Sequence, residues 1–129
     1  MQRDLVLRWI EQLGRLVARL LGRGGKAELA VARDQVAEAT LGLLGPLATL
    51  VPRLETASAA ELLADPDRIF GYAQLLDLDG VIAEGLGDAT GSAESRRRAL
   101  EFAKVALSRS REPVPEWERW IRLRTETTI

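Results

Sequence analysis

RDLVLRWIEQLGRLVARLLG spans residues 3–22 and carries the clearest periodic pattern in this 129-residue chain. Its apolar residues recur at three- and four-residue steps, which places them on one face of a helix. Charged residues, among them Arg8, Glu11, Arg15 and Arg19, take the other face. The stretch therefore predicts an amphipathic helix that must bury one apolar stripe, made of Val6, Trp9, Ile10, Leu13, Leu16, Val17 and Leu20.

The next stretch predicts a partner for this helix. The cluster of Gly22, Gly24 and Gly25 adopts left-handed backbone conformations cheaply and is therefore expected to end the first helix. Residues 27–44 then repeat the helical spacing of apolar positions, until Gly45 and Pro46 stop the pattern. Because the connection between the two helices is short, we expect them to form an antiparallel hairpin.

Helix signals continue after this hairpin with varying strength. Between residues 47 and 63 the pattern is faint, and only a short helix is expected. Asp65 followed by Pro66 combines an N-capping carboxylate with proline at the first helical position. A helix is therefore predicted over residues 66–86, although three internal glycines weaken it. A last long helix is expected to begin at a capping Ser92.

The chain closes with a short element behind two prolines. Pro113 and Pro115 break the last long helix, and residues 115–124 predict a short amphipathic one. The pattern as a whole predicts an all-α fold of antiparallel hairpins stacked in a tetratricopeptide-like arrangement. We expect two parts, a helical domain over residues 1–112 and a proline-bounded tail over residues 113–129.

Composition narrows the chemistry. The chain contains no histidine and no cysteine, the side chains that most often serve as proton shuttle, thiol nucleophile or zinc ligand. We therefore expect a protein that is not an enzyme and that uses no metal or other cofactor. Without cysteines nothing indicates an oxidising compartment, so a cytoplasmic location is expected.

Charge is distributed unevenly along the sequence. Residues 1–26 carry a net charge of +4, residues 27–90 carry −8 and residues 91–129 carry +3. The overall pI near 5.6 and the lack of a recognised nucleic-acid-binding motif argue against nucleic-acid binding. No segment has the length and hydrophobicity of a membrane span. The first helix could lie on a bilayer surface, but the apolar stripe of the second helix needs it as a partner.

Two segments resemble known helical families. RALEFAKVAL, residues 98–107, resembles the second helix of a tetratricopeptide unit. The opening stretch is similar to the start of a bacterial family of unknown function, in which Asp-Tyr precedes an Arg-x-Ile-Glu-x-aliphatic pattern. Arg8, Ile10, Glu11 and Leu13 match this pattern, while Leu5 stands where the tyrosine is usual. The resemblance implies stacked helices and no particular activity. A faint internal repeat agrees with it, since Ala32, Val36 and Ala39 have the same spacing as Ala99, Ala103 and Ala106.

LLDLDGVI, residues 75–82, resembles the nucleophile motif of haloacid dehalogenase phosphatases. That resemblance implies Asp77 as the nucleophile, Asp79 as the acid/base and magnesium on both. The motif belongs at the end of a strand, whereas the residues before it predict a helix. A helical interpretation makes Asp77 and Asp79 exposed positions of a helix interrupted at Gly80. A calcium-loop register fails because its first and twelfth places would be leucines.

The function favoured by these patterns is a non-catalytic protein-interaction or self-association module. A protein or peptide partner would bind an inter-helix groove and the tail, or a second copy would pack on the first helix or exchange tails. The alternative is a divergent magnesium-dependent phosphatase using Asp77 and Asp79. Tryptophan and arginine are enriched at binding hot spots. The candidate partner-binding residues are Trp117, Trp120, Ile121, Arg96 and Arg97.

Overall fold

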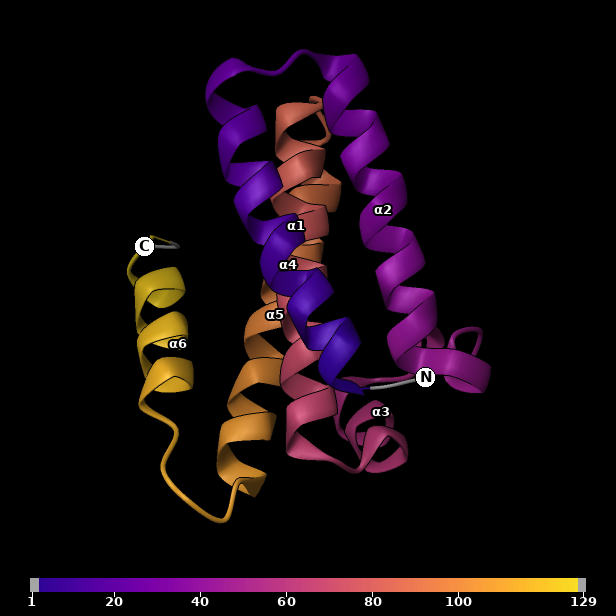
Figure 1. Ribbon diagram of the computed structural model, residues 1–129. Helices are drawn as coiled ribbons and strands as arrows, with labels where there is room; N and C mark the ends of the chain where they lie inside the picture. The colour runs from indigo at the N-terminus through magenta and orange to yellow at the C-terminus, as the bar shows by residue number, and fades with distance from the viewer. Residues whose placement is uncertain (1–2, 128–129) are drawn as a thin grey trace.

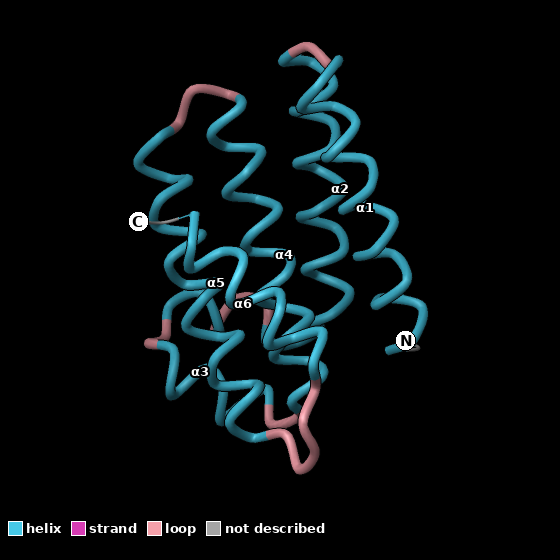
Figure 2. The backbone as a smooth tube through the Cα atoms, turned by 90° about the vertical axis from the view of Figure 1, so that its left-hand side faces the viewer, coloured by secondary structure: helices cyan, strands magenta, loops and turns pink. Residues whose placement is uncertain are grey.

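The computed structural model describes residues 3–127, and all regular structure within them is helical. The all-α prediction is confirmed, and Figure 2 shows no strand in the traced backbone. Two short 3₁₀ turns, Gly45–Leu47 and Val51–Arg53, separate the first hairpin from the later helices. The α-helices are α1 (Arg3–Arg23), α2 (Lys26–Leu44), α3 (Thr56–Leu63), α4 (Pro66–Gly85), α5 (Ala89–Arg109) and α6 (Pro115–Thr127).

The helices form two stacked hairpins and a covering helix. Helices α1 and α2 lie antiparallel in one layer, and α4 and α5 lie antiparallel in the next (Figures 1 and 2). Helix α4 packs against both members of the first hairpin, while α6 runs beside α5 on the side away from α2 (Figure 1). The expected stacking of hairpins is therefore present. The short α3 comes between the two pairs in chain order and lies at the lower end of the molecule in Figure 1, against α4 and α5.

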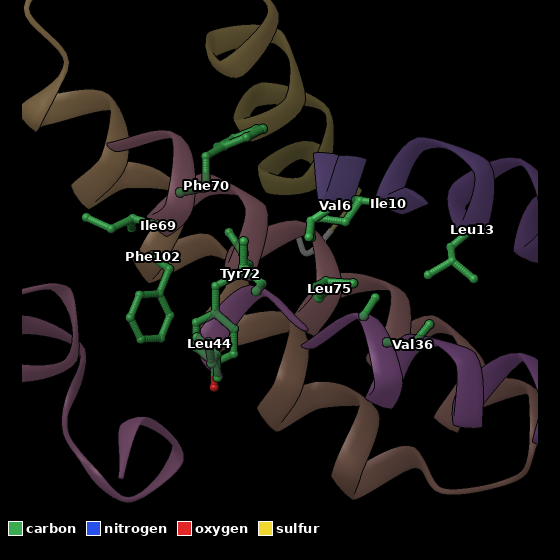
Figure 3. Close-up of a cluster of buried hydrophobic side chains, with 14 of the residues drawn as sticks. Val6, Ile10, Leu13, Val36, Leu44, Ile69, Phe70, Tyr72, Leu75 and Phe102 are labelled. Atoms are coloured by element: carbon green, nitrogen blue, oxygen red, sulfur yellow. The ribbon is translucent and has the colours of Figure 1, made fainter. Parts of the chain in front are cut away.

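The predicted stripe of α1 explains how the first hairpin holds together. Val6, Ile10, Leu13 and Val17 are each at most 2% exposed, and they meet apolar residues of α2 and α4 in the common core (Figure 3). The expected ending by left-handed glycines was wrong, because α1 continues through Gly22 to Arg23 and neither Gly24 nor Gly25 has a positive φ. The amide of Gly24 donates to the carbonyl of Leu20 and closes the last turn. The matched positions of the faint repeat are buried in both copies. Each of them is at most 2% exposed: Ala32, Val36, Ala39, Ala99, Ala103 and Ala106.

Helix α4 is the centre of the molecule. Its buried residues point in all directions because it contacts α1, α2, α3 and α5, and its Phe70 reaches α6 (Figure 3). The expectation that Gly80 interrupts this helix was wrong, since α4 continues to Gly85. A Cβ on Gly80 would lie 2.6 Å from Cγ of Arg96 and 3.1 Å from the carbonyl oxygen of Ser92. Glycine here permits close approach of α5, and packing outweighs its low helix propensity.

Two predicted boundaries differ from the structure. Helix α5 begins at Ala89, three residues before the expected start, and Asp88 rather than Ser92 caps it. The carboxylate of Asp88 accepts from the amide of Gly91 at 2.9 Å, while Ser92 is buried in the first turn. The tail helix α6 follows Pro113 as expected and extends beyond residue 124; the last two residues of the tail lie outside the described residues.

Candidate functional site

An open groove runs along α5 between the second half of α4 and the end of α6. It has a volume of about 540 Å³, within the range of about 300–1,000 Å³ typical of ligand-binding clefts. We call it the α4–α5 groove. It is lined by Asp77, Glu84, Ala89, Ser92, Ala93, Arg96, Arg97, Leu100, Glu101, Lys104 and Arg124.

The contribution of α5 to this groove has a regular spacing. The α5 residues at 89, 92, 93, 96, 97, 100, 101 and 104 follow three- and four-residue steps over about 22 Å of helix. Such a stripe is the surface that one helix presents to another. Helix α6 has 13 residues against 20 in α4, and it ends beside Asp77, so this part of the stripe is left open.

Ion pairs edge the groove on both sides. Nη1 of Arg96 lies 3.2 Å from Oε2 of Glu84 and bridges α5 to α4. Arg97 pairs with Glu94 at 2.6 Å and also with Glu101, one turn away on either side. The hydrogen bond from Arg97 lowers the pKa of Glu94, and the same bond raises the pKa of Arg97.

Asp77 closes the groove where α6 ends. Its side chain is 8% exposed, and Oδ2 accepts from Nε of Arg124 at 3.0 Å. The guanidinium of Arg124 also lies 3.8 Å from the ring centroid of Trp120, a cation–π contact. The expectation that Asp77 is exposed was wrong, because an arginine 47 residues away supplies the partner that a buried carboxylate requires.

Asp79 also accepts hydrogen bonds from neighbouring helices, and it lies on the opposite side of α4 from Asp77. Oδ1 accepts from Nε of Arg33 in α2 at 2.9 Å, and Ser95 donates to Oδ2 at 3.5 Å. The hydrogen bond to Asp79 raises the pKa of Arg33. Asp79 is part-buried, so its expected exposure was wrong as well. Each of the two aspartates thus links α4 to a different neighbouring helix.

The phosphatase-like motif therefore has a different setting from the one it requires. Residues 75–82 lie within α4, whereas that motif needs a strand that ends at its first aspartate. Among the described residues, no three aspartate, glutamate, histidine or cysteine side chains come together as a set of metal ligands. The chemistry that the arrangement visibly supports at Asp77 and Asp79 is electrostatic cross-linking of helices.

The tail aromatics face their own domain. The rings of Phe70 and Trp117 stack with centroids 4.5 Å apart and an interplanar angle of 11°. Trp120 meets the same phenylalanine edge-on at 5.3 Å, and Ile121 is partly buried against the core. Each aromatic pair contributes about 0.5–1.5 kcal/mol beyond the burial of its area. Of the predicted partner-binding residues, Arg96 and Arg97 line the groove, while the three tail residues fix α6.

Other groove residues were missed by the sequence analysis. Ala93, Leu100 and Lys104 form part of the open stripe, and Glu84 faces them from α4. Their helical spacing was a usable signal, but α5 has alanines on both its buried and its exposed faces. The pattern alone therefore did not distinguish the face covered by α4 from the open one.

No protein-family model matches this chain, and comparisons with curated proteins and with solved structures give no match either. The similarity of the opening stretch to a bacterial family, and of residues 98–107 to a tetratricopeptide unit, stays a prediction. None of the helices within residues 3–127 combines the length and hydrophobicity that crossing a membrane requires.

Proposed function

We propose that this chain is a non-catalytic protein-interaction module that receives a helical segment of a partner protein in the α4–α5 groove. The observation that carries the proposal is the open stripe of α5, whose three- and four-residue spacing suits a second helix. Docking of an amphipathic helix into a groove is a common mode of peptide recognition. The proposal keeps the expectations of a cytoplasmic location and of no cofactor.

The shape of the groove supports a helix rather than a compact small molecule. The stripe extends over about 22 Å, enough for roughly four turns of a docked helix. Ala89, Ala93 and Leu100 offer small and apolar contact surface, while charged side chains stand along the edges. An apolar centre with a polar edge is the usual anatomy of a protein–protein contact.

The partner's own chemistry can be inferred from these contacts. A helix with one narrow apolar stripe would cover Ala93 and Leu100. Acidic side chains beside that stripe would reach Lys104, whose amine has no ion-pair partner among the described residues. The proposal therefore favours an amphipathic partner helix with acidic flanks.

A photo-crosslinking amino acid placed at Ala93 tests the proposal in the native host. Ala93 is exposed and lines the groove, so a bound partner helix lies within reach of the probe. The matched control carries the same amino acid at Ala57, an exposed alanine of α3 outside the groove. We expect a defined protein adduct from position 93 that position 57 does not give. Adducts that are identical at both positions, or absent from both, would contradict the proposal.

A further inference from the structure

A second surface of the molecule lies on the outer side of the first hairpin. On α1, Arg8, Arg15, Arg19 and Arg23 are all exposed. At 100° per residue they fall within a stripe about 80° wide, opposite the buried stripe of the same helix. None of these four arginines has an ion-pair partner among the described residues. The exposed side of α1 is therefore a basic ridge.

The neighbouring helix carries the opposite charge. Asp34 and Glu38 are exposed on α2, and neither has an ion-pair partner within residues 3–127. Val31 and Leu41 flank them and are 57% and 59% exposed. The four positions are spaced by steps of three, four and three residues, the spacing of a helix–helix contact. The exposed side of α2 is thus an acidic and apolar ridge.

Elsewhere in the chain, arginines that face neighbouring helices are engaged. Arg96, Arg97 and Arg109 form ion pairs, and Arg98 donates to the carbonyls of Pro52 and Leu54. On the first hairpin, by contrast, four arginines unpartnered among the described residues gather on the outer side of α1, and two such unpartnered carboxylates lie on the outer side of α2. Figure 2 shows these helices as an outer layer of the stack, so both ridges are open to another molecule.

We propose that this outer face binds a second copy of the chain, with the basic ridge of α1 on the acidic ridge of α2 from the partner. A two-fold axis across the hairpin makes this contact twice, because each copy brings one ridge of each sign. Val31 and Leu41 then lose water contact against the aliphatic stems of arginines. The surface is distinct from the α4–α5 groove, so the two proposals stand or fall separately.

The area of the outer face of the first hairpin sets the expected affinity of the dimer. Two helices about 30 Å long and about 10 Å apart present roughly 600 Å² per copy, or about 1,200 Å² in total. This value is at the lower end of specific interfaces, so the dimer is expected to be reversible. Since its charges are close to solvent, association should weaken as ionic strength rises.

Sedimentation analysis of charge-reversed variants tests the pairing of the ridges. One variant carries Arg8→Glu with Arg15→Glu, and the other carries Asp34→Arg with Glu38→Arg. Each alone should associate about 100-fold more weakly than the wild type, because both contacts of the dimer then oppose like charges. An equimolar mixture of the two should form heterodimers, and the protein with all four changes should again form homodimers.

Controls separate this result from loss of folding or an unrelated charge effect. All variants should keep the wild-type far-ultraviolet spectrum, since every changed residue is exposed. Arg119→Glu with Arg122→Glu, the same charge change on the exposed side of α6, should leave the mass distribution unchanged. Wild-type protein that stays monomeric at low ionic strength would overturn the proposal. This holds whether or not the monomer binds phosphatidylserine vesicles through its basic ridge. So would a mixture in which the two reversed variants fail to combine.

Discussion

Asp77 and Arg124 couple the central helix of this protein to its last one, with Nε and Oδ2 3.0 Å apart. The aspartate is almost fully buried, and the arginine also covers the ring of Trp120. A carboxylate in the middle of α4 is therefore neutralised by a residue at the far end of the chain. The groove that we propose as a binding site opens directly beside this pair.

Replacing Arg124 by methionine should lower the free energy of unfolding by about 1–2 kcal/mol. The change leaves Asp77 charged and without this partner, and the partial exposure of the arginine keeps the loss below that of a fully buried pair. Urea denaturation followed by circular dichroism gives the value. Adding Asp77→Asn to Arg124→Met should cost less than the sum of the single changes, and strict additivity would show that the pair is not coupled.

Two glycine substitutions should change stability in opposite directions. Gly80→Ala should destabilise the protein by about 1–2 kcal/mol, because the new methyl group meets Arg96 and the backbone of Ser92. Gly14→Ala in α1 should stabilise by about 0.5–1 kcal/mol, since its methyl group meets nothing within 4 Å and alanine favours the helix. Thermal or urea unfolding of both variants checks the pair. Stabilisation by Gly80→Ala would show that α4 and α5 are farther apart than described.

The single tyrosine, Tyr72, predicts how the stability of the protein changes at alkaline pH. Burial raises the pKa of Tyr72 above its ordinary value of 10.0, against the opposing charge of Arg98. The unfolded chain therefore loses this proton first, so the stability that the tyrosine contributes is complete below pH 10 and declines as the pH rises towards the folded pKa. The free energy of unfolding falls by at most about 1.4 kcal/mol per pH unit as a result of this one group.

Absorbance at the tyrosinate band reads this event directly, because the chain holds one tyrosine. We expect tyrosinate to appear together with the loss of helical signal, above pH 10. Tyr72→Phe keeps the edge-on packing against Phe102 and should remove this part of the alkaline loss. Tyrosinate that forms in fully helical protein near pH 10 would contradict the burial argument.

How much the sequence predicts depends on whether a pattern is local. The helix of residues 3–23 was predictable because its apolar stripe faces one side only. Helix α4 is buried on several sides, so it lacks a clear stripe, and Gly80 looked like an interruption rather than a contact. The prediction therefore had the right helix but the wrong environment for it.

The candidate site was less predictable for a related reason. The spacing of Trp117 and Trp120 correctly indicated one side of a helix but not the phenylalanine that covers it. Burial of Asp77 depends on Arg124, and no local pattern connects residues so far apart in sequence. Arg96 and Arg97 were predicted as binding residues, and they do line the groove, whereas the open stripe of α5 to which they belong was found only in the structure.

The proposed function depends most on the α4–α5 groove being the binding surface. Its most direct test is the affinity of the partner crosslinked from position 93, measured by titration calorimetry with two variants of the whole chain. Ala93→Trp fills the groove and should weaken binding at least about tenfold, while Ala57→Trp on α3 should bind as the wild type does. Equal affinities for the two variants would contradict the proposed function.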